Sequence, residues 1–329
     1  MPHTKIENQI ESEHFTLHTL ADGVYAAIAT EGGAAFSNAG LIDLGDLTLV
    51  FDAFENPQAA EDLRKASRLL TGRDPAVVII SHFHPDHWGG LQVFADSTIL
   101  ATPDTRKQMA PIAKEMTKDR QDPSRIEKDL QKLEEQLAAE KDANKQRILQ
   151  LSAARQRHTL RALPTHEPTL PDQTFDGKIV FHGGKRTAEL ISAGKGHTLS
   201  DAILYLPQDR LVFIGDIGFF QSQPFLPYGF PAEWIALLEH LATWKVKTFI
   251  PGHGPLGGKA ALTLEAEYIR ALEAMVQRVI QAGGTEEDAL HTTLPAPFDA
   301  WQAVGQRFEA NVRASHKRQR KQAGSIGKA

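Results

Sequence analysis

Short apolar segments bounded by turn residues dominate the first hundred positions and predict a β-sheet. Six segments fit strands, at residues 15–18, 23–28, 39–42, 48–51, 76–80 and 97–101. Alternating or compact apolar runs of this length are typical of strands. Residues 56–70 instead have helical periodicity, with Pro57 suited to a first turn and Gly72 to a C-terminal cap.

A second series of strands begins after Pro171. The segments are residues 178–182, 187–192, 202–206, 211–214 and 248–250. Helical patterns follow at residues 232–244, 262–282 and 298–312. The chain therefore consists of two halves, each a run of strands followed by a helix, which indicates an α/β fold.

The segment from residue 105 to residue 163 interrupts this pattern. Strand signals vanish, and Lys, Arg, Glu, Gln and Ala dominate. One apolar seam with 4-3-4 spacing runs through Ile126, Leu130, Leu133 and Leu137. We expect an inserted helical hairpin that breaks near Asp142. It is either a solvated surface pair, an arm for homodimer formation or a lid over a site, because a narrow seam needs a partner surface.

A histidine-rich turn follows the apolar run that ends at Ile80. Its sequence is Ser81-His82-Phe83-His84-Pro85-Asp86-His87. Histidines crowded beside an aspartate repel one another if protonated and cost free energy when desolvated. A bound metal ion removes both problems. The turn therefore predicts a metal site at a strand end, with a merely histidine-rich polar loop as the alternative.

Three further residues in the second half are candidate ligands. His197, Asp216 and His253 each lie beside a glycine and follow an apolar run. Glycine permits the tight turn that directs such a side chain outward. Taken singly, each is typical of an ordinary turn residue. Their occurrence together with the histidine-rich turn favours a shared metal site.

Composition limits the remaining function classes. The chain has 329 residues, 41% of them hydrophobic, a net charge of −5 and no cysteine. Disulfides, thiolate zinc sites and cysteine nucleophiles are thereby excluded. The modest negative charge gives no basic field for nucleic acid. No stretch resembles a signal peptide or a membrane span, so we expect a cytoplasmic protein without a membrane partner.

These ligands, in this order, resemble the metallo-β-lactamase superfamily and its dinuclear branch. The similarity spans residues 15–255 and includes Asp52 before the turn. It implies a four-layer αββα sandwich in residues 1–260, with the insertion at residues 105–163. Helices at residues 261–315 would pack on this domain. The basic residues 316–329 would be a flexible tail, with phosphate or nucleic-acid contact as the alternative.

The resemblance also implies a role for each ligand. His82, His84 and His197 would bind a first metal ion, and Asp86, His87 and His253 a second. Asp216 would bridge the two ions, and Asp52 would orient a ligand imidazole. Imidazole and carboxylate suit zinc first, with iron or manganese as alternatives. A metal-bridging hydroxide would attack the substrate, with Asp86 and Asp216 as catalytic residues and Asp86 as proton relay.

Differences between this sequence and well-known branches of the superfamily reduce the number of possible activities. Lactamases with a cysteine ligand are excluded, and the histidine-ligand group lacks a bridging carboxylate where this chain has Asp216. β-Lactam cleavage is therefore expected only as a side activity. The residues after Asp216 do not resemble those of glyoxalase II-like enzymes. Phe219 stands where homoserine-lactone hydrolases often have tyrosine.

Aromatic residues near these motifs are candidates for a substrate pocket, with core packing as the alternative. They are Phe36, Trp88, Phe219, Phe220, Phe225, Tyr228 and Phe230, with Lys195 as a candidate for an anionic group. We expect a small-molecule carboxylic ester, lactone or thioester as substrate. The alternatives are a phosphodiesterase or nuclease and an iron-dependent oxidoreductase.

Overall fold

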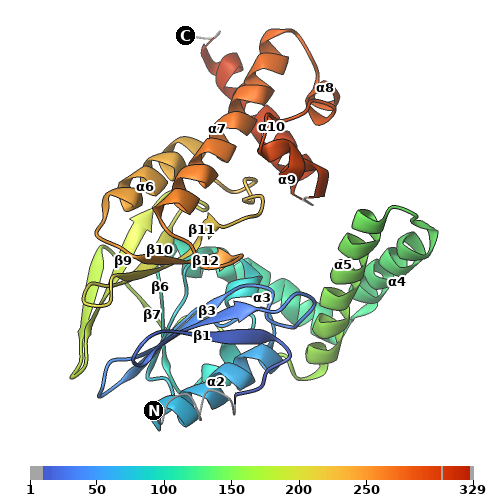
Figure 1. The fold of residues 1–329 in the computed structure, drawn as a ribbon. Coiled ribbons are helices and arrows are strands. Elements are labelled where there is room, and N and C mark those ends of the chain that lie inside the picture. The colour runs from blue at the N-terminus through green and yellow to red at the C-terminus, as the bar shows by residue number, and fades with distance from the viewer. Residues whose placement is uncertain (1–9, 305–306, 327–329) are drawn as a thin grey trace.

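Two packed β-sheets with helices on their outer faces form the body of the protein (Figure 1). The computed structural model describes residues 10–304 and 307–326. The first sheet has the order β1-β2-β3-β4-β5-β6-β7, and the second has the order β12-β11-β10-β9-β8. This arrangement confirms the expected αββα sandwich.

The first sheet is antiparallel from β1 to β4 and parallel from β4 to β7. Its strands are β1 (Phe15–Ala21), β2 (Val24–Ala29), β3 (Ala39–Asp43), β4 (Thr48–Phe51), β5 (Val77–Ile79), β6 (Thr98–Ala101) and β7 (Gln173–Thr174). The second sheet is antiparallel except for the parallel pair β11/β12. Its strands are β8 (Lys178–His182), β9 (Thr187–Gly194), β10 (Asp201–Leu206), β11 (Leu211–Phe219) and β12 (Thr248–His253).

Three apolar layers hold the sandwich together. Between the sheets, residues such as Leu49, Phe51 and Phe213 form one buried cluster. Helix α2 (Pro57–Thr71) covers the first sheet, and helices α6 (Pro231–Thr243) and α7 (Lys259–Gln281) cover the second. As predicted, α2 begins at Pro57 and is capped by Gly72 in the left-handed conformation.

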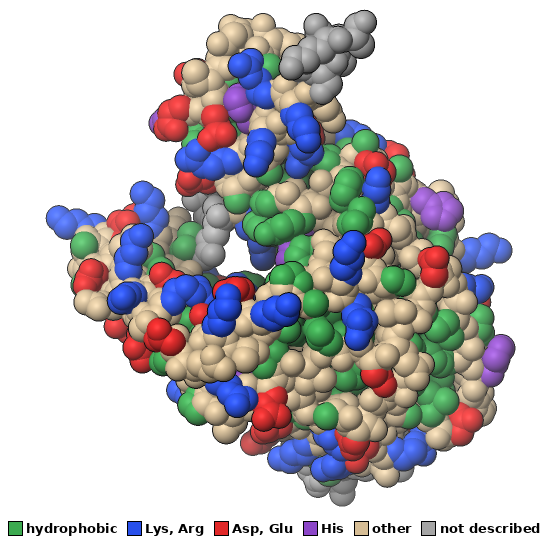
Figure 2. All heavy atoms as spheres, turned by 180° about the vertical axis from the view of Figure 1, so that it is seen from behind, with side chains coloured by type: hydrophobic (Ala, Val, Ile, Leu, Met, Phe, Trp, Pro, Cys, Tyr) green, Lys and Arg blue, Asp and Glu red, His purple; other side chains and the backbone are tan. Residues whose placement is uncertain are grey.

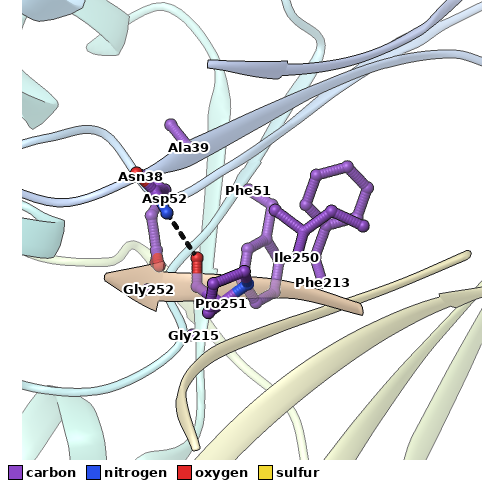
Figure 3. Close-up of a pocket in the computed structure, with 9 residues that line it drawn as sticks. All are labelled: Asn38, Ala39, Phe51, Asp52, Phe213, Gly215, Ile250, Pro251 and Gly252. Atoms are coloured by element: carbon purple, nitrogen blue, oxygen red, sulfur yellow. Dashed lines mark hydrogen bonds between the residues drawn. The ribbon is translucent and has the colours of Figure 1, made fainter. Parts of the chain in front are cut away.

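The two sheets are also joined by polar contacts at one end (Figure 3). The Asn38 side-chain amide donates to the Pro251 carbonyl at 2.9 Å, the contact drawn in Figure 3. It also donates to the Gly254 carbonyl at 2.9 Å. The space beside it, lined by Phe51, Phe213 and their neighbours, is too small for a water molecule. It is therefore packed interior rather than a ligand site. Asn38 fixes the loop before β3 to the end of β12.

The inserted segment contains three helices rather than one hairpin. Helix α3 (Pro103–Gln121) buries Met109 and Ala113 against the core of the first half. Helices α4 (Ser124–Ala139) and α5 (Ala143–Ala162) form the predicted hairpin, which projects from the body (Figure 1). The prediction of a hairpin over the whole range 105–163 is thus corrected. The apolar positions of α3 belong to the main domain.

The apolar seam of α4 has its partner within the same hairpin. Helix α4 packs along α5, and Ile126 is buried while Leu130, Leu133 and Leu137 are partly buried. The break falls where predicted, with the Asp142 side chain capping α5. Because α5 already covers the seam, the seam alone does not require a second copy of the chain. Homodimer formation through the hairpin stays a prediction.

The region after α7 differs from the predicted helix at residues 298–312 and the predicted flexible tail. Its helices are α8 (Glu286–Leu290), α9 (Phe298–Val304) and α10 (Phe308–Ile326). The basic run lies within α10, where Arg318 pairs with Glu273 of α7 at 2.7 Å and Gln319 donates to the Glu273 carbonyl. The prediction of a flexible tail at residues 316–329 is therefore wrong as far as Ile326. Residues 327–329 lie outside the described part.

Three 3₁₀ helices complete the described elements, namely η1 (Pro85–His87), η2 (Leu91–Phe94) and η3 (Leu163–Thr165). Among the residues that the structure describes, no helix is both long enough and apolar enough to cross a bilayer.

Helix α10 is anchored to the loop that follows β11. The fully buried Asn311 side chain accepts from the Leu226 N–H and donates to the Pro224 carbonyl, both at 2.8 Å. Both backbone groups would lose their partner without this side chain. The C-terminal helices therefore hold the loop at residues 220–230 in place.

We predict that Asn311→Ala lowers the free energy of unfolding by about 1–3 kcal/mol, because it leaves two buried backbone groups unpaired. Urea denaturation would measure this loss. Lys317→Ala, at an exposed position of the same helix, should change stability by less than about 0.5 kcal/mol. Equal effects of the two substitutions would contradict the anchoring role.

Candidate metal centre

All seven predicted ligands meet at one edge of the sandwich. His82 and His84 follow β5, while Asp86 and His87 lie in η1. The second sheet contributes the remaining three, namely His197 from the turn after β9, Asp216 from β11 and His253 from the end of β12. Both sheets thus supply donors, as the sequence predicted.

Asp216 lies inside a strand that is longer than predicted. The strand continues through Asp216 to Phe219, and its pairing with β12 is irregular at Gly215. Gly215 has a φ of 51°, and a Cβ there would lie 2.6 Å from the Cβ of Ser81. Only glycine fits this close approach. The irregularity directs the Asp216 carboxylate into the site.

Four donor atoms form a first donor set, consisting of His82 Nε2, His84 Nδ1, His197 Nε2 and Asp216 Oδ2. His84 Nδ1 lies 3.0 Å from His82 Nε2 and 2.9 Å from His197 Nε2. Asp216 Oδ2 lies 3.5 Å and 3.3 Å from the same two atoms. A tetrahedral zinc ion with bonds of about 2.0–2.1 Å has donors roughly 3.3–3.4 Å apart. The spacing fits such an ion.

A second donor set consists of Asp86 Oδ2, His87 Nε2, His253 Nε2 and Asp216 Oδ1. Asp86, His87 and His253 lie close enough together to hold a metal ion by themselves. Asp216 adds a fourth donor. Asp86 Oδ2 is 3.6 Å from His87 Nε2 and 3.1 Å from His253 Nε2. Asp216 Oδ1 is 3.0 Å and 3.4 Å from the same nitrogens. The two oxygens of Asp216 therefore face different donor sets.

Buried polar atoms without hydrogen-bond partners show that the donor sets suit cations. His87 Nε2 and Asp216 Oδ1 are buried and make no hydrogen bond to the described residues. In the first donor set, three imidazole nitrogens converge, and a proton between two of them leaves the third without a partner. Unpaired buried polar groups cost free energy. Imidazole and carboxylate donors suit divalent ions such as zinc, iron or manganese.

The imidazoles of the first donor set are held in the neutral form that binds metals. Burial holds the pKa values of His82 and His197 well below their usual range, and burial lowers the pKa of His84 to about 4. Neighbouring imidazoles add to the effect at His82. At neutral pH these nitrogens therefore offer lone pairs.

The second donor set has the opposite balance. Burial opposes charge on His87 and His253, but carboxylates, with Asp216 foremost, outweigh it and raise both pKa values. Burial likewise opposes ionisation of Asp86 and Asp216, but the histidines hold both carboxyl pKa values well below the usual range. The second donor set therefore concentrates negative charge, and a bound cation can take the place of the protons on its histidines.

Asp52 and Ser81 orient two of the imidazoles. Asp52, which is fully buried with a φ of 62°, accepts at 2.8 Å from His87 Nδ1, from the Ser81 hydroxyl and from the Ser81 N–H. The hydroxyl in turn lies 2.9 Å from His82 Nδ1 and accepts its proton. Nε2 of His82 is left as an acceptor facing the first donor set, and Nε2 of His87 is directed toward the second. The sequence predicted Asp52 and missed Ser81, whose only signal is its position directly before His82.

Some of the predicted pocket residues surround the site. Phe36 is 36% exposed and contacts His253 edge-on at 5.6 Å between ring centroids, and Tyr228 is 55% exposed and 5.2 Å from His84. Phe225 lies 5.8 Å from His84. Phe219 is buried and stacks on His253 at 4.9 Å. Phe36, Phe225 and Tyr228, which we call the aromatic rim, leave apolar surface beside the donor sets.

The structure places the other predicted pocket residues elsewhere. Trp88 is fully buried and donates to the Phe83 carbonyl, and Phe220 is 2% exposed and packs in the core of the second half. The prediction that these two, and Phe219 with 1% of its surface exposed, line a pocket is wrong. Lys195 lies with its amino group 5.0 Å above the Phe230 ring. Among the described residues, it forms no hydrogen bond or ion pair with the donor residues.

The sequence also missed charged residues at this edge. Arg155 of α5 donates from Nε to both carboxylate oxygens of Glu55 at 2.8 Å and lies 3.4 Å above the Phe36 ring. Burial raises the pKa of Glu55, while Arg155 opposes that shift. The hairpin therefore reaches the aromatic rim and is not a remote surface arm. Arg307, between α9 and α10, lies 4.9 Å from the Phe219 ring.

Comparison with solved structures shows the same fold. A metallo-beta-lactamase from Pontibacter korlensis matches with a TM-score of 0.54 and 16% identity, covering 78% of this chain and 99% of that one. The metallo-beta-lactamase FIM-1 from Pseudomonas aeruginosa in its mono-zinc form matches with a TM-score of 0.53 and 15% identity, covering 79% and 96%. No curated protein sequence matches the chain.

The family model of the metallo-beta-lactamase superfamily matches residues 32–253, which is more than half of the chain. The matched range contains Asp52 and all seven donor residues and ends at His253. The helices after it, α7 to α10, lie outside the match. The chain belongs to the metallo-beta-lactamase superfamily.

Proposed function

We propose that the protein is a hydrolase with two divalent metal ions, zinc foremost, that cleaves a carboxylic ester, lactone or thioester. One observation carries the proposal. The Asp216 carboxylate directs Oδ2 toward the first donor set and Oδ1 toward the second. A carboxylate shared in this way suits two ions held about 3.5–4 Å apart.

Bound ions would supply a hydroxide nucleophile near neutral pH and polarise the scissile carbonyl group. The chain's own residues position this chemistry. Asp52 and Ser81 fix the orientation of His82 and His87. The Ser37 hydroxyl donates to the Asp86 carbonyl at 2.5 Å and holds the turn that carries this carboxylate. Asp86 would pass a proton to the leaving group.

The surroundings favour a partly apolar substrate. The aromatic rim exposes ring surface next to His84 and His253. Apolar contacts of this kind suit an acyl chain or ring. The similar solved proteins are metallo-beta-lactamases by name, but at 15–16% identity they indicate the fold and not the substrate.

A hydrolysis screen of the metal-loaded protein tests this function. We predict turnover of esters, lactones or thioesters and at most slow turnover of β-lactams. Neither class should be cleaved after metal removal with a chelator. Turnover of phosphodiesters alone would contradict the proposed substrate class.

We predict that Asp216→Ala reduces the bound metal from two ions per chain to one or fewer, because both donor sets lose an oxygen. Equilibrium dialysis followed by elemental analysis would measure this. Turnover should fall by more than the roughly 10- to 100-fold cost of losing an outer-shell partner. Asp176→Ala, which removes an exposed carboxylate, is the matched control. Two retained ions in Asp216→Ala would refute the bridging role.

Asp52→Asn should weaken metal binding by about 10- to 100-fold, because the amide no longer fixes the His87 tautomer as the carboxylate does. Ser81→Ala should weaken binding less, since only the contact to His82 is lost. Competition with a metallochromic chelator would measure both affinities. Wild-type affinity in Asp52→Asn would show that the carboxylate is not needed for orientation.

A further inference from the structure

Arg307 lies at the site but outside the part of the chain that matches the superfamily. It precedes α10, and its carbonyl accepts from the Asn311 N–H in the first turn of that helix. Gln223 holds it from the loop after β11. The Gln223 side-chain oxygen accepts from the Arg307 N–H at 3.2 Å, and its carbonyl accepts from Nη1 at 2.9 Å. The C-terminal helices therefore bring this arginine to the site.

One aromatic ring separates each of two arginines from His253. The Arg307 guanidinium lies 4.9 Å from the centre of the Phe219 ring, which stacks on His253. The Arg155 guanidinium lies over Phe36, which contacts the same imidazole edge-on. Two cations thus flank the second donor set. Figure 2 shows the surface hollowed between the hairpin, the C-terminal helices and the main body, with Lys and Arg as well as Asp and Glu side chains around the hollow.

The two arginines differ in their partners. Arg155 is neutralised by the Glu55 carboxylate. Arg307 has no carboxylate within ion-pair distance among the described residues, and Nη1 alone of its guanidinium nitrogens has an acceptor there. Its side chain is only partly buried. The Nε–Nη2 edge therefore has no partner among the described residues, and two parallel N–H groups match the two oxygens of a carboxylate.

The positive charge of Arg307 would also lack a compensating negative charge once metal ions are bound. Burial lowers its pKa, and the field of Asp216 and Asp86 opposes the shift. Arginine nevertheless stays charged at neutral pH. In the proposed hydrolase, bound cations take up the charge of those two carboxylates. The guanidinium is then left uncompensated in a recessed position, which favours an anionic ligand.

We propose that Arg307 binds a carboxylate of the substrate, so that the hydrolase prefers esters or thioesters whose acyl chain also carries an acid group. This inference rests on the proposed hydrolase function. The aromatic rim would contact the chain between the scissile group and the acid. Arg307 would act as a specificity determinant supplied by the C-terminal helices.

Binding of simple acids tests the inference without turnover. Isothermal titration calorimetry of the metal-loaded protein would compare dicarboxylates from succinate to suberate with monocarboxylates of equal length. Both acids can meet the metal ions, but only the dicarboxylate can also reach Arg307. We predict that at least one dicarboxylate binds about 10- to 100-fold tighter than its monocarboxylate, the range for a hydrogen bond to a charged group.

Arg307→Gln should abolish this preference, and Arg307→Lys should restore part of it because the charge remains without the paired edge. Arg313→Gln, on the exposed side of the same helix, is the matched control and should keep the preference. Equal binding of both acids by the wild type, or a preference that survives Arg307→Gln, would overturn the role of Arg307.

Hydrolysis provides the second readout. The 4-nitrophenyl monoester of the preferred dicarboxylate would be compared with its methyl-capped form, and the ratio of kcat/KM values should fall about tenfold or more in Arg307→Gln. If the wild type hydrolyses neither ester, the proposed function fails while the calorimetry still decides on Arg307. If the wild type hydrolyses both esters and Arg307→Gln leaves the ratio of their kcat/KM values unchanged, the inference on Arg307 fails and the proposed function stands.

Discussion

The carboxylate of Asp216 is the feature on which the site depends. Its two oxygens lie within 3.0–3.5 Å of four imidazole nitrogens that come from both sheets. Without cations, this arrangement leaves buried polar atoms unpaired and crowds imidazoles together. The stability of the site is therefore coupled to cation binding, because a bound ion replaces hydrogen bonds that the protein itself does not provide.

The rest of the fold holds the two halves of this site at a fixed distance. Gly215 allows β11 to approach Ser81 of the other sheet, and Asn38 joins the loop before β3 to the end of β12. Asp52 accepts hydrogen bonds from both Ser81 and His87 and so links these two residues. These short, buried contacts hold the donors of the two sheets at fixed positions relative to one another. The C-terminal helices add Arg307 and fix the loop with Phe225 and Tyr228.

The ordered ligand motif carried the family resemblance that implied the αββα fold, and the candidate ligands at strand ends are the residues that the structure brings together. It did not predict which aromatic side chains are exposed. Trp88 and Phe220 lie near the motif in sequence, yet burial depends on packing that the local sequence does not encode. Ser81 and Arg307 were missed because their hydrogen bonds, to Asp52 and to Gln223, link residues that are far apart in the sequence. The tail prediction failed because basic residues of α10 meet a carboxylate, Glu273, that is remote in sequence.

The electron paramagnetic resonance spectrum of the manganese-loaded protein tests the central claim, that one carboxylate joins two metal ions, most directly. Two Mn²⁺ ions bridged by Asp216 should give an exchange-coupled spectrum at full loading. The same measurement on Asp216→Asn should give the signal of isolated ions. A wild-type spectrum of isolated Mn²⁺ at every loading would contradict the bridged site.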